Sequence, residues 1–218
     1  MVFGGLKGLF GRAAQPTQRM TGPLGLGIGR AASLDVMRLR LEESRLAMQL
    51  PPDTLVISGH GTAPLDGTSV IHRYYDDKHT TLQILCTGGT SEDCITEITL
   101  YHLWDELVPA THQEWAVWDG PEAKIGQAVF EADGFRFERV WGDPSTPWIQ
   151  PAEFTEEVEV DEGPRKVIHQ KIMPYRREVG ILVEPLLIAV ERDLASNDRG
   201  GISFMIGYGL SPADVTPV

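Results

Sequence analysis

The chain of 218 residues carries 31 acidic and 19 basic residues, which gives a formal net charge of −12. A surface of this sign repels the phosphate backbone, so we expect no nucleic-acid binding. With 42% hydrophobic and 23% charged residues, the composition is that of an ordinary folded protein. It excludes a largely disordered chain, and a core of this size needs no metal or disulfide.

The sequence contains no stretch of the ~20 apolar residues that would span a bilayer, and residues 1–14 lack the continuous apolar core of a secretory signal. We therefore expect a cytoplasmic protein without a transmembrane segment. The two cysteines, Cys86 and Cys94, are then expected to stay reduced. A disulfide or a metal site that combines them with a histidine stays open, because they flank one loop between two predicted strands.

Residues 1–32 are rich in glycine and predict a flexible arm that stands apart from the domain. Within it, residues 1–12 combine apolar side chains with Lys7 and Arg12. This segment could contact a membrane surface peripherally, although its glycines oppose a stable helix, and a poorly ordered tail is the alternative.

The next segment, residues 33–49, predicts a helix that begins at Ser33 as the N-cap and ends before Pro51 and Pro52. A strand over residues 36–40 is an alternative. A second, short helix is predicted near residues 110–119, with Trp115 and Trp118 on one face.

Most of the remaining chain alternates apolar and polar residues with period two, which is typical of strands that have one buried face. Asp66-Gly67 and Asp133-Gly134 predict hairpins with type I′ turns, and Pro185 predicts a bulge or an edge position in its strand. Residues 211–218 are expected to be a C-terminal tail. We therefore expect one α+β domain over residues 33–210, predominantly antiparallel β with two short helices and about ten short strands: 54–60, 69–76, 80–87, 94–104, 128–132, 135–141, 153–160, 165–173, 181–191 and 201–208.

No motif in the sequence identifies a catalytic or cofactor site, and we predict no cofactor. None of the six histidines forms a helical His-x-x-x-His pair, and no Gly-x-Ser-x-Gly is present. The acid pair Glu156-Glu157 is interpreted as part of a solvated strand face, since neighbouring strand residues point to opposite sides.

Five residues are candidates for an interaction or ligand site. Arg139 shares the apolar face of a predicted strand, so it either anchors an anion or acidic peptide, forms an internal ion pair, or lays its stem over the core. Trp115 and Trp118 would mark a protein-binding patch if they were exposed. His72 and Tyr74 would join Arg139 in a ligand-binding or enzyme site that forms only in the fold.

An ordered set of short segments resembles the bacterial YjfK-like family, whose function is unknown. The set comprises Pro23-Leu24-Gly25-Leu26, Ile28-Gly29, Leu34-Asp35, His72-Arg73-Tyr74-Tyr75, Gln113-Glu114-Trp115, Trp118, Gly120, Ile125-Gly126-Gln127, Arg139-Val140-Trp141-Gly142 and Tyr175-Arg176-Arg177-Glu178. The resemblance implies no established activity and no catalytic residues. It does imply genes encoded beside relatives of the phage-shock membrane-stress protein. From this we predict a non-catalytic adaptor in an envelope-stress system, cytoplasmic or peripheral to the inner membrane, with a phage-shock-type protein as its partner.

Overall fold

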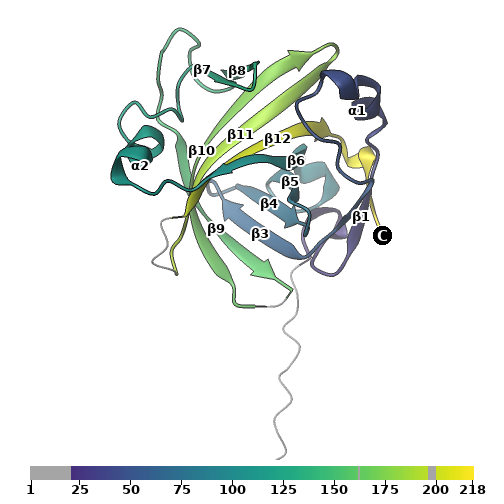
Figure 1. Ribbon diagram of the computed structural model, residues 1–218. Coiled ribbons are helices and arrows are strands. Elements are labelled where there is room, and N and C mark those ends of the chain that lie inside the picture. Colours follow the sequence, from purple (N-terminus) through teal and green to yellow (C-terminus); the bar gives the residue numbers. More distant parts are fainter. Residues whose placement is uncertain (1–20, 162, 196–199) are drawn as a thin grey trace, which may run out of the picture.

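Eight antiparallel strands close into a barrel in the computed structural model, which describes residues 21–161, 163–195 and 200–218 (Figure 1). The order around the barrel is β3, β4, β5, β6, β12, β11, β10 and β9, and β9 pairs again with β3. The strands are β3 (Gly59–Pro64), β4 (Ser69–Tyr75), β5 (Thr80–Thr87), β6 (Ile95–Leu107), β9 (Ala152–Val160), β10 (Lys166–Val179), β11 (Leu182–Asp193) and β12 (Gly201–Leu210).

Closure by the β10–β11 pairing removes the free edges that an open sheet of this size would expose. The fold class predicted from the alternation is therefore confirmed. Pro185 lies where β11 is paired with β10 alone, because pairing with β12 begins at Leu186, and this agrees with the expected edge position.

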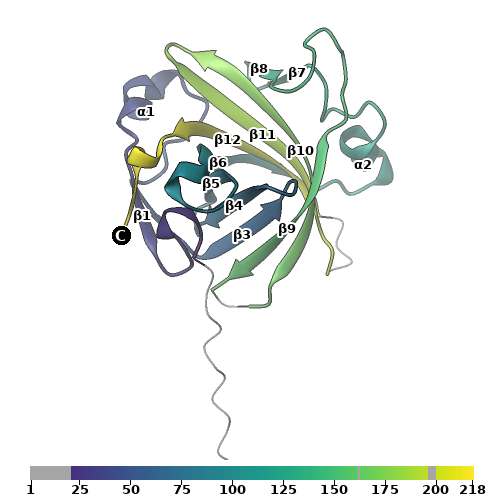
Figure 2. The ribbon, with the colours of Figure 1, turned by 180° about the vertical axis from the view of Figure 1, so that it is seen from behind.

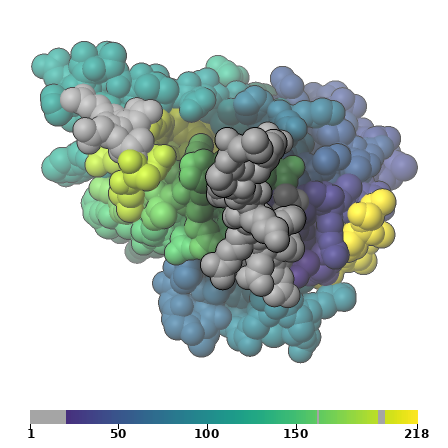
Figure 3. Space-filling model, turned by 90° about the horizontal axis from the view of Figure 1, so that it is seen from below, coloured from purple at the N-terminus to yellow at the C-terminus, as the bar shows by residue number. Residues whose placement is uncertain are grey.

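The first and last described strands meet in a second, three-stranded sheet beside the barrel, in the order β13 (Val215–Pro217), β1 (Ala31–Leu34) and β2 (Thr54–Val56). Figure 2 labels the C-terminus next to β1, and Figure 3 shows the first described residues beside the C-terminal ones. The expectation of a tail over residues 211–218 is wrong. η4 (Pro212–Asp214) leads into β13, and Val215 is buried.

The helix predicted over residues 33–49 is much shorter in the structure. Ser33 belongs to β1 and caps no helix, and only α1 (Met37–Glu42) and the 3₁₀ turn η2 (Glu43–Arg45) are helical. Pairing of β1 with both β2 and β13 provides backbone partners that outweigh local helix propensity.

Residues 21–32 pack against the barrel and do not form a separate arm. The 3₁₀ turn η1 (Pro23–Gly25) comes first in this segment. It is followed by Leu26, which is fully buried, and Ile28, which is also buried. These apolar side chains join the main core, which lies between the outer barrel face and its covering segments. The predicted membrane-contact segment, residues 1–12, lies outside the described residues.

The second helix, α2 (His112–Asp119), matches its prediction and begins with a reciprocal cap. The Thr111 side chain accepts a hydrogen bond from the Glu114 amide, and the Glu114 carboxylate accepts one from the Thr111 amide. On the barrel side, the Trp118 ring lies edge-on against Phe204 of β12, with 5.2 Å between the ring centroids.

The hairpin of β7 (Val129–Ala132) and β8 (Phe135–Arg139) extends from β10. Its turn has φ of 50° at Asp133 and 79° at Gly134, as the type I′ prediction requires. The same prediction is wrong for Asp66-Gly67, where neither φ is positive. There the Asp66 carboxylate accepts hydrogen bonds from the amides of Thr68 and Ser69, which stabilises a longer turn.

Within the described residues, neither α1 nor α2 has the length and apolar character that crossing a membrane requires.

Candidate functional site

One end of the barrel lumen is filled with apolar side chains. These inner residues lie at alternate positions on their strands and form a second core, separate from the main one: Ala63, Ile71, Tyr101, Phe154, Ile172, Leu187 and Ala189, with Leu85, Ala152 and Met205 packed against them. The lumen is therefore closed at this end, as expected for a narrow eight-stranded barrel.

A polar layer lies next to this second core inside the barrel. We call it the lumen network, and it consists of Arg73, Tyr75, Gln83, Glu156 and Gln170. The Arg73 Nη1 donates to Glu156 Oε2 at 2.8 Å and to Gln170 Oε1 at 2.6 Å, and Nε donates to Gln83 Oε1 at 2.9 Å. Tyr75 Oη and Gln170 Nε2 donate to the two oxygens of the Glu156 carboxylate at 2.6 and 2.7 Å. Charged groups this deeply buried are tolerated because they are paired and hydrogen-bonded.

The backbone of β3 leaves room for this network at Gly61. A Cβ atom built on Gly61 would lie 1.7 Å from Glu156 Oε1, far inside contact distance. Glycine at this position therefore lets the Glu156 carboxylate occupy the wall between β3 and β9.

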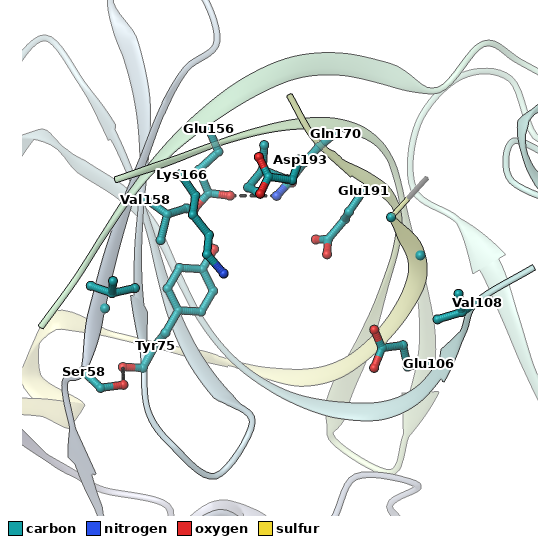
Figure 4. Close-up of a pocket in the computed structure, with 15 residues that line it drawn as sticks. Ser58, Tyr75, Glu106, Val108, Glu156, Val158, Lys166, Gln170, Glu191 and Asp193 are labelled. Atoms are coloured by element: carbon teal, nitrogen blue, oxygen red, sulfur yellow. Dashed lines mark hydrogen bonds between the residues drawn. The ribbon is translucent and has the colours of Figure 1, made fainter. Parts of the chain in front are cut away.

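Beyond the lumen network, the lumen opens into a cavity of about 470 Å³. Figure 4 shows Tyr75, Lys166 and Glu191 pointing into the space that the strands enclose. Apolar side chains of β9 and β10 form one wall, and carboxylates lie on several strands. The lining residues are Ser58, Gly59, Tyr75, Glu106, Val108, Glu156, Val158, Val160, Lys166, Ile168, Gln170, Glu191, Asp193, Gly200 and Gly201.

The titrating group of this cavity is Glu191. Burial raises the pKa of its carboxyl to about 7, Arg73 opposes the rise, and the carboxylates of Glu156 and Glu106 add to it. Burial, followed by the negative charge of Glu156, also raises the pKa of Tyr75 well above its usual value. Tyr75 is therefore a neutral hydrogen-bond donor, whereas Glu191 changes charge near neutral pH.

The candidate residues His72 and Tyr74 lie on the opposite, outer face of β4. His72 Nδ1 lies 3.2 Å from His60 Nε2, the rings of His60 and Tyr74 stack at 4.7 Å, and Tyr74 Oη donates to the Pro23 carbonyl. Burial, followed by the positive charge of a protonated His72, lowers the pKa of His60 to about 4, and burial lowers that of His72. This cluster holds the N-terminal described segment against the barrel.

Arg139 is buried, but it forms neither the predicted ion pair nor an open anion site. Its guanidinium donates to the carbonyls of Gly126, Trp141, Asp143 and Thr146 at 2.7 to 3.0 Å. Because these carbonyls belong to two loops around β7 and β8, Arg139 stabilises loop structure. It does not meet His72 or Tyr74, whose partners are His60 and residues near Pro23.

Trp115 and Trp118 are buried between α2 and the barrel, with exposed fractions of 6% and 7%. The Trp115 ring lies under the Arg192 guanidinium at 5.6 Å, and Trp118 packs against Phe204 and Phe130. The two indoles therefore do not form an exposed patch.

The lumen residues were not predicted from the sequence, above all Glu156, whose alternating pattern indicated a solvent-facing side chain. The structure places Glu156 at 1% exposure inside the barrel, whereas its neighbour Glu157 is exposed and pairs with Arg165. The signal that could have revealed the lumen residues is the set of polar side chains, such as Arg73 and Gln170, at alternate positions of their strands. In a closed barrel such a face can line a lumen instead of meeting bulk water.

Across the described residues, no group of three or more His, Cys, Asp or Glu is arranged to hold a metal ion. Cys86 and Cys94 are both free thiols, Cys86 buried and Cys94 partly exposed. The alternative of a disulfide between them is therefore not realised in this structure.

Comparison with known proteins places the chain in a family without an assigned function. A family model described as a protein of unknown function (DUF2491) matches residues 6–216. The uncharacterized protein YjfK of Escherichia coli (strain K12) is 29% identical over 171 residues, which cover 78% of this chain and 77% of YjfK. No solved structure shows a significant match to the chain. The resemblance noted in the sequence is thus confirmed, and the chain belongs to the DUF2491 family of proteins of unknown function.

Proposed function

We propose that this protein binds a small molecule in the lumen of its barrel. The observation that carries the proposal is the lumen network at the base of a cavity of about 470 Å³. Ligand pockets of proteins commonly have volumes of about 300–1,000 Å³, with apolar walls and a few placed polar groups. Val158, Val160 and Ile168 provide such a wall here, and Tyr75, Glu156 and Gln170 provide the polar groups.

The rigidity of the base supports binding over a purely structural role. Both Glu156 oxygens are hydrogen-bonded, and Gln170 is fixed between Arg73 and Glu156. Groups held in place in this way lose little conformational entropy when a ligand arrives. A barrel that needed only stability could fill the same volume with apolar side chains, as its other end does.

The test is a screen of a small-molecule library by native mass spectrometry, with each hit checked by calorimetry. The matched variant is Ile168→Trp, which fills the lumen, and the control is Val183→Trp at the exposed start of β11, which does not line the cavity. We expect hits that bind the wild type and the control but not Ile168→Trp. If no compound distinguishes the wild type from a folded Ile168→Trp protein, the proposal is wrong.

The adaptor role in an envelope-stress system, with a phage-shock-type partner, stays a prediction. The burial of Trp115 and Trp118 removes the exposed indole patch that would have supported it. In-cell crosslinking of a tagged chain, followed by mass spectrometry of the products, would test it directly.

A further inference from the structure

The charges that line the lumen are unbalanced. Four carboxylates of the described residues line the cavity, and Arg73 neutralises one of them, Glu156, through a direct ion pair. Among the described residues, the remaining three, Glu106, Glu191 and Asp193, face one lining cation, Lys166. In the described part of the chain, none of the ion pairs includes any of these three carboxylates.

Glu191 has the most demanding position of the three. It projects toward the centre of the lumen (Figure 4) and belongs to none of the ion pairs of the described residues, although Arg73 lowers its pKa and so offsets part of the cost of its burial. A buried carboxylate is stabilised when an opposite charge approaches within about 4–6 Å. A ligand that carries a positive group would provide that charge.

Two buried polar atoms beside Glu191 also lack hydrogen-bond partners among the described residues. They are Ser203 Oγ on β12 and Arg73 Nη2 on β4, with residue exposures of 9% and 4%. Unpaired buried polar atoms are uncommon and cost free energy. Arg73 Nη2 is a donor, so an ammonium group cannot satisfy it, whereas the Ser203 oxygen keeps a lone pair for a ligand even when its proton is directed at Glu191. The Ser203 hydroxyl can accept a hydrogen bond from an ammonium group.

Arg73 is the feature that would instead favour an anionic ligand. It does not line the cavity, however, and Glu156 and Gln170 stand between its paired Nη1 and the open space. An incoming anion would meet Glu106, Glu191 and Asp193 first. Like charges in a poorly solvated site repel strongly, so the acidic lining outweighs the arginine behind it.

We propose that the lumen selects a small organic cation, an amine whose ammonium group lies against Glu191 and whose apolar portion lies along Val158 and Ile168. The inference rests on the proposed function and names the ligand class of that same site. Tyr75 contributes an aromatic ring on the opposite side of the lumen, and its hydroxyl proton is donated to Glu156. Aromatic faces favour cations, which agrees with this class.

The test compares three probes of equal chain length: hexylamine, hexanol and hexanoate. Binding is followed by NMR of the labelled methyl groups of Ile168 and Val158, which report lumen occupancy directly. We expect hexylamine to bind at least about tenfold more tightly than hexanoate, with hexanol between them, because the charge difference acts in a partly desolvated site.

The matched variants are Glu191→Gln and Glu138→Gln, the second on the outside of β8 with a side chain that is 72% exposed. Glu191→Gln should weaken hexylamine by about tenfold and leave hexanol unchanged, whereas Glu138→Gln should change neither. Folding of both variants is verified by the methyl spectrum, so loss of binding cannot be attributed to unfolding.

A second readout is the pH dependence of hexylamine binding. The groups that face Glu191 are Arg73 from β4, Glu156 from β9, Glu106 from β6 and Ser203 from β12. Because the ammonium requires an ionised Glu191, affinity should rise between about pH 6 and pH 8 in the wild type and stay flat in Glu191→Gln.

The outcomes separate this inference from the proposed function. Tighter binding of hexanoate or hexanol at Ile168 overturns the cationic class and leaves lumen binding in place. Absence of methyl shifts with all three probes at millimolar concentration overturns the amine inference, and the library screen with Ile168→Trp then decides the proposed function by itself.

Discussion

Arg73 and Glu156 meet inside the barrel although 83 residues separate them in the sequence, and the Nη1 and Oε2 atoms lie 2.8 Å apart. The two side chains are almost fully buried, 5% and 1% exposed. A strand beside each of them also points a polar side chain inward, Gln83 of β5 next to β4 and Gln170 of β10 next to β9. This pair joins β4 to β9, the two strands that flank β3 in the barrel.

Replacing one partner of this pair should destabilise the protein strongly. Glu156→Leu leaves the Arg73 charge buried without compensation, and we expect a loss of about 3–5 kcal/mol in the free energy of unfolding. The double variant Arg73→Met/Glu156→Leu should recover part of this loss. Urea unfolding measures both, and Glu157→Gln at the neighbouring exposed position should cost less than about 1 kcal/mol. Equal losses for Glu156→Leu and Glu157→Gln would contradict the assignment.

Gly61→Ala should also destabilise the protein, because its methyl group would collide with the Glu156 carboxylate. We expect a cost of about 1–3 kcal/mol, as for other overpacked sites. The control is Gly209→Ala in β12, where a Cβ atom meets nothing within 4 Å. A Gly61→Ala protein as stable as the Gly209→Ala protein would show that the wall of β3 can move away.

The outer histidine cluster predicts a loss of stability in acid. The pKa of His60 is about 4 in the folded protein and about 6.5 in the unfolded chain, so the unfolded state binds more protons between these values. The free energy of unfolding should therefore rise with pH from about 4 to 6.5, by at most about 3 kcal/mol from this group. NMR titration of the imidazole gives the pKa directly, and a value near 6.5 for His60 would refute the prediction.

Glu191 predicts the opposite slope in an overlapping pH range. Its pKa of about 7 in the folded state exceeds the ordinary 4.5, so the folded protein binds more protons between these values. Stability from this group is present below about pH 4.5 and is lost as the pH rises through 7. Relative to the wild type, Glu191→Gln should therefore gain about 1–3 kcal/mol between pH 4.5 and 8, which denaturant unfolding can measure. A difference that stays constant with pH would exclude this role, and the His60 slope is best measured in the Glu191→Gln background.

Arg139→Lys should loosen the loops around β7 and β8, because an ammonium cannot donate to four carbonyls in the geometry of a guanidinium. We expect a loss of about 2–4 kcal/mol and faster proteolysis near Asp143, since buried carbonyls lose their donor. Arg136→Lys, whose side chain is 59% exposed, is the control and should change little. Unchanged proteolysis at Asp143 in Arg139→Lys would show that the loops hold without the arginine.

Local patterns in the sequence were sufficient to predict most barrel strands but could not predict how they close. The prediction over residues 80–87 coincides with β5, and Asp133-Gly134 predicted the β7–β8 turn, because alternation and turn chemistry are local properties. Pairing of His60 with Glu159, which joins β3 to β9, depends on residues far apart in the chain. No short window of sequence contains that information.

The candidate site was missed for a related reason. Alternation divides β4 into one face with His72 and Tyr74 and another with Arg73 and Tyr75, but it does not state which face meets solvent. The prediction chose His72 and Tyr74, whereas the functional candidates lie on the other face. Only closure of the barrel determines that Arg73 and Glu156 point toward each other.

The order of strands around the barrel also determines when the protein can complete its fold during synthesis. β3, β4, β5 and β6 form a meander of sequential neighbours. The two outer strands of this meander pair with strands encoded after residue 151: β3 with β9, and β6 with β12. A nascent chain that has emerged only as far as α2 therefore presents two unpaired strand edges, the kind of surface on which intermolecular aggregation begins. The last third of the chain thus protects the first strands from association with other chains.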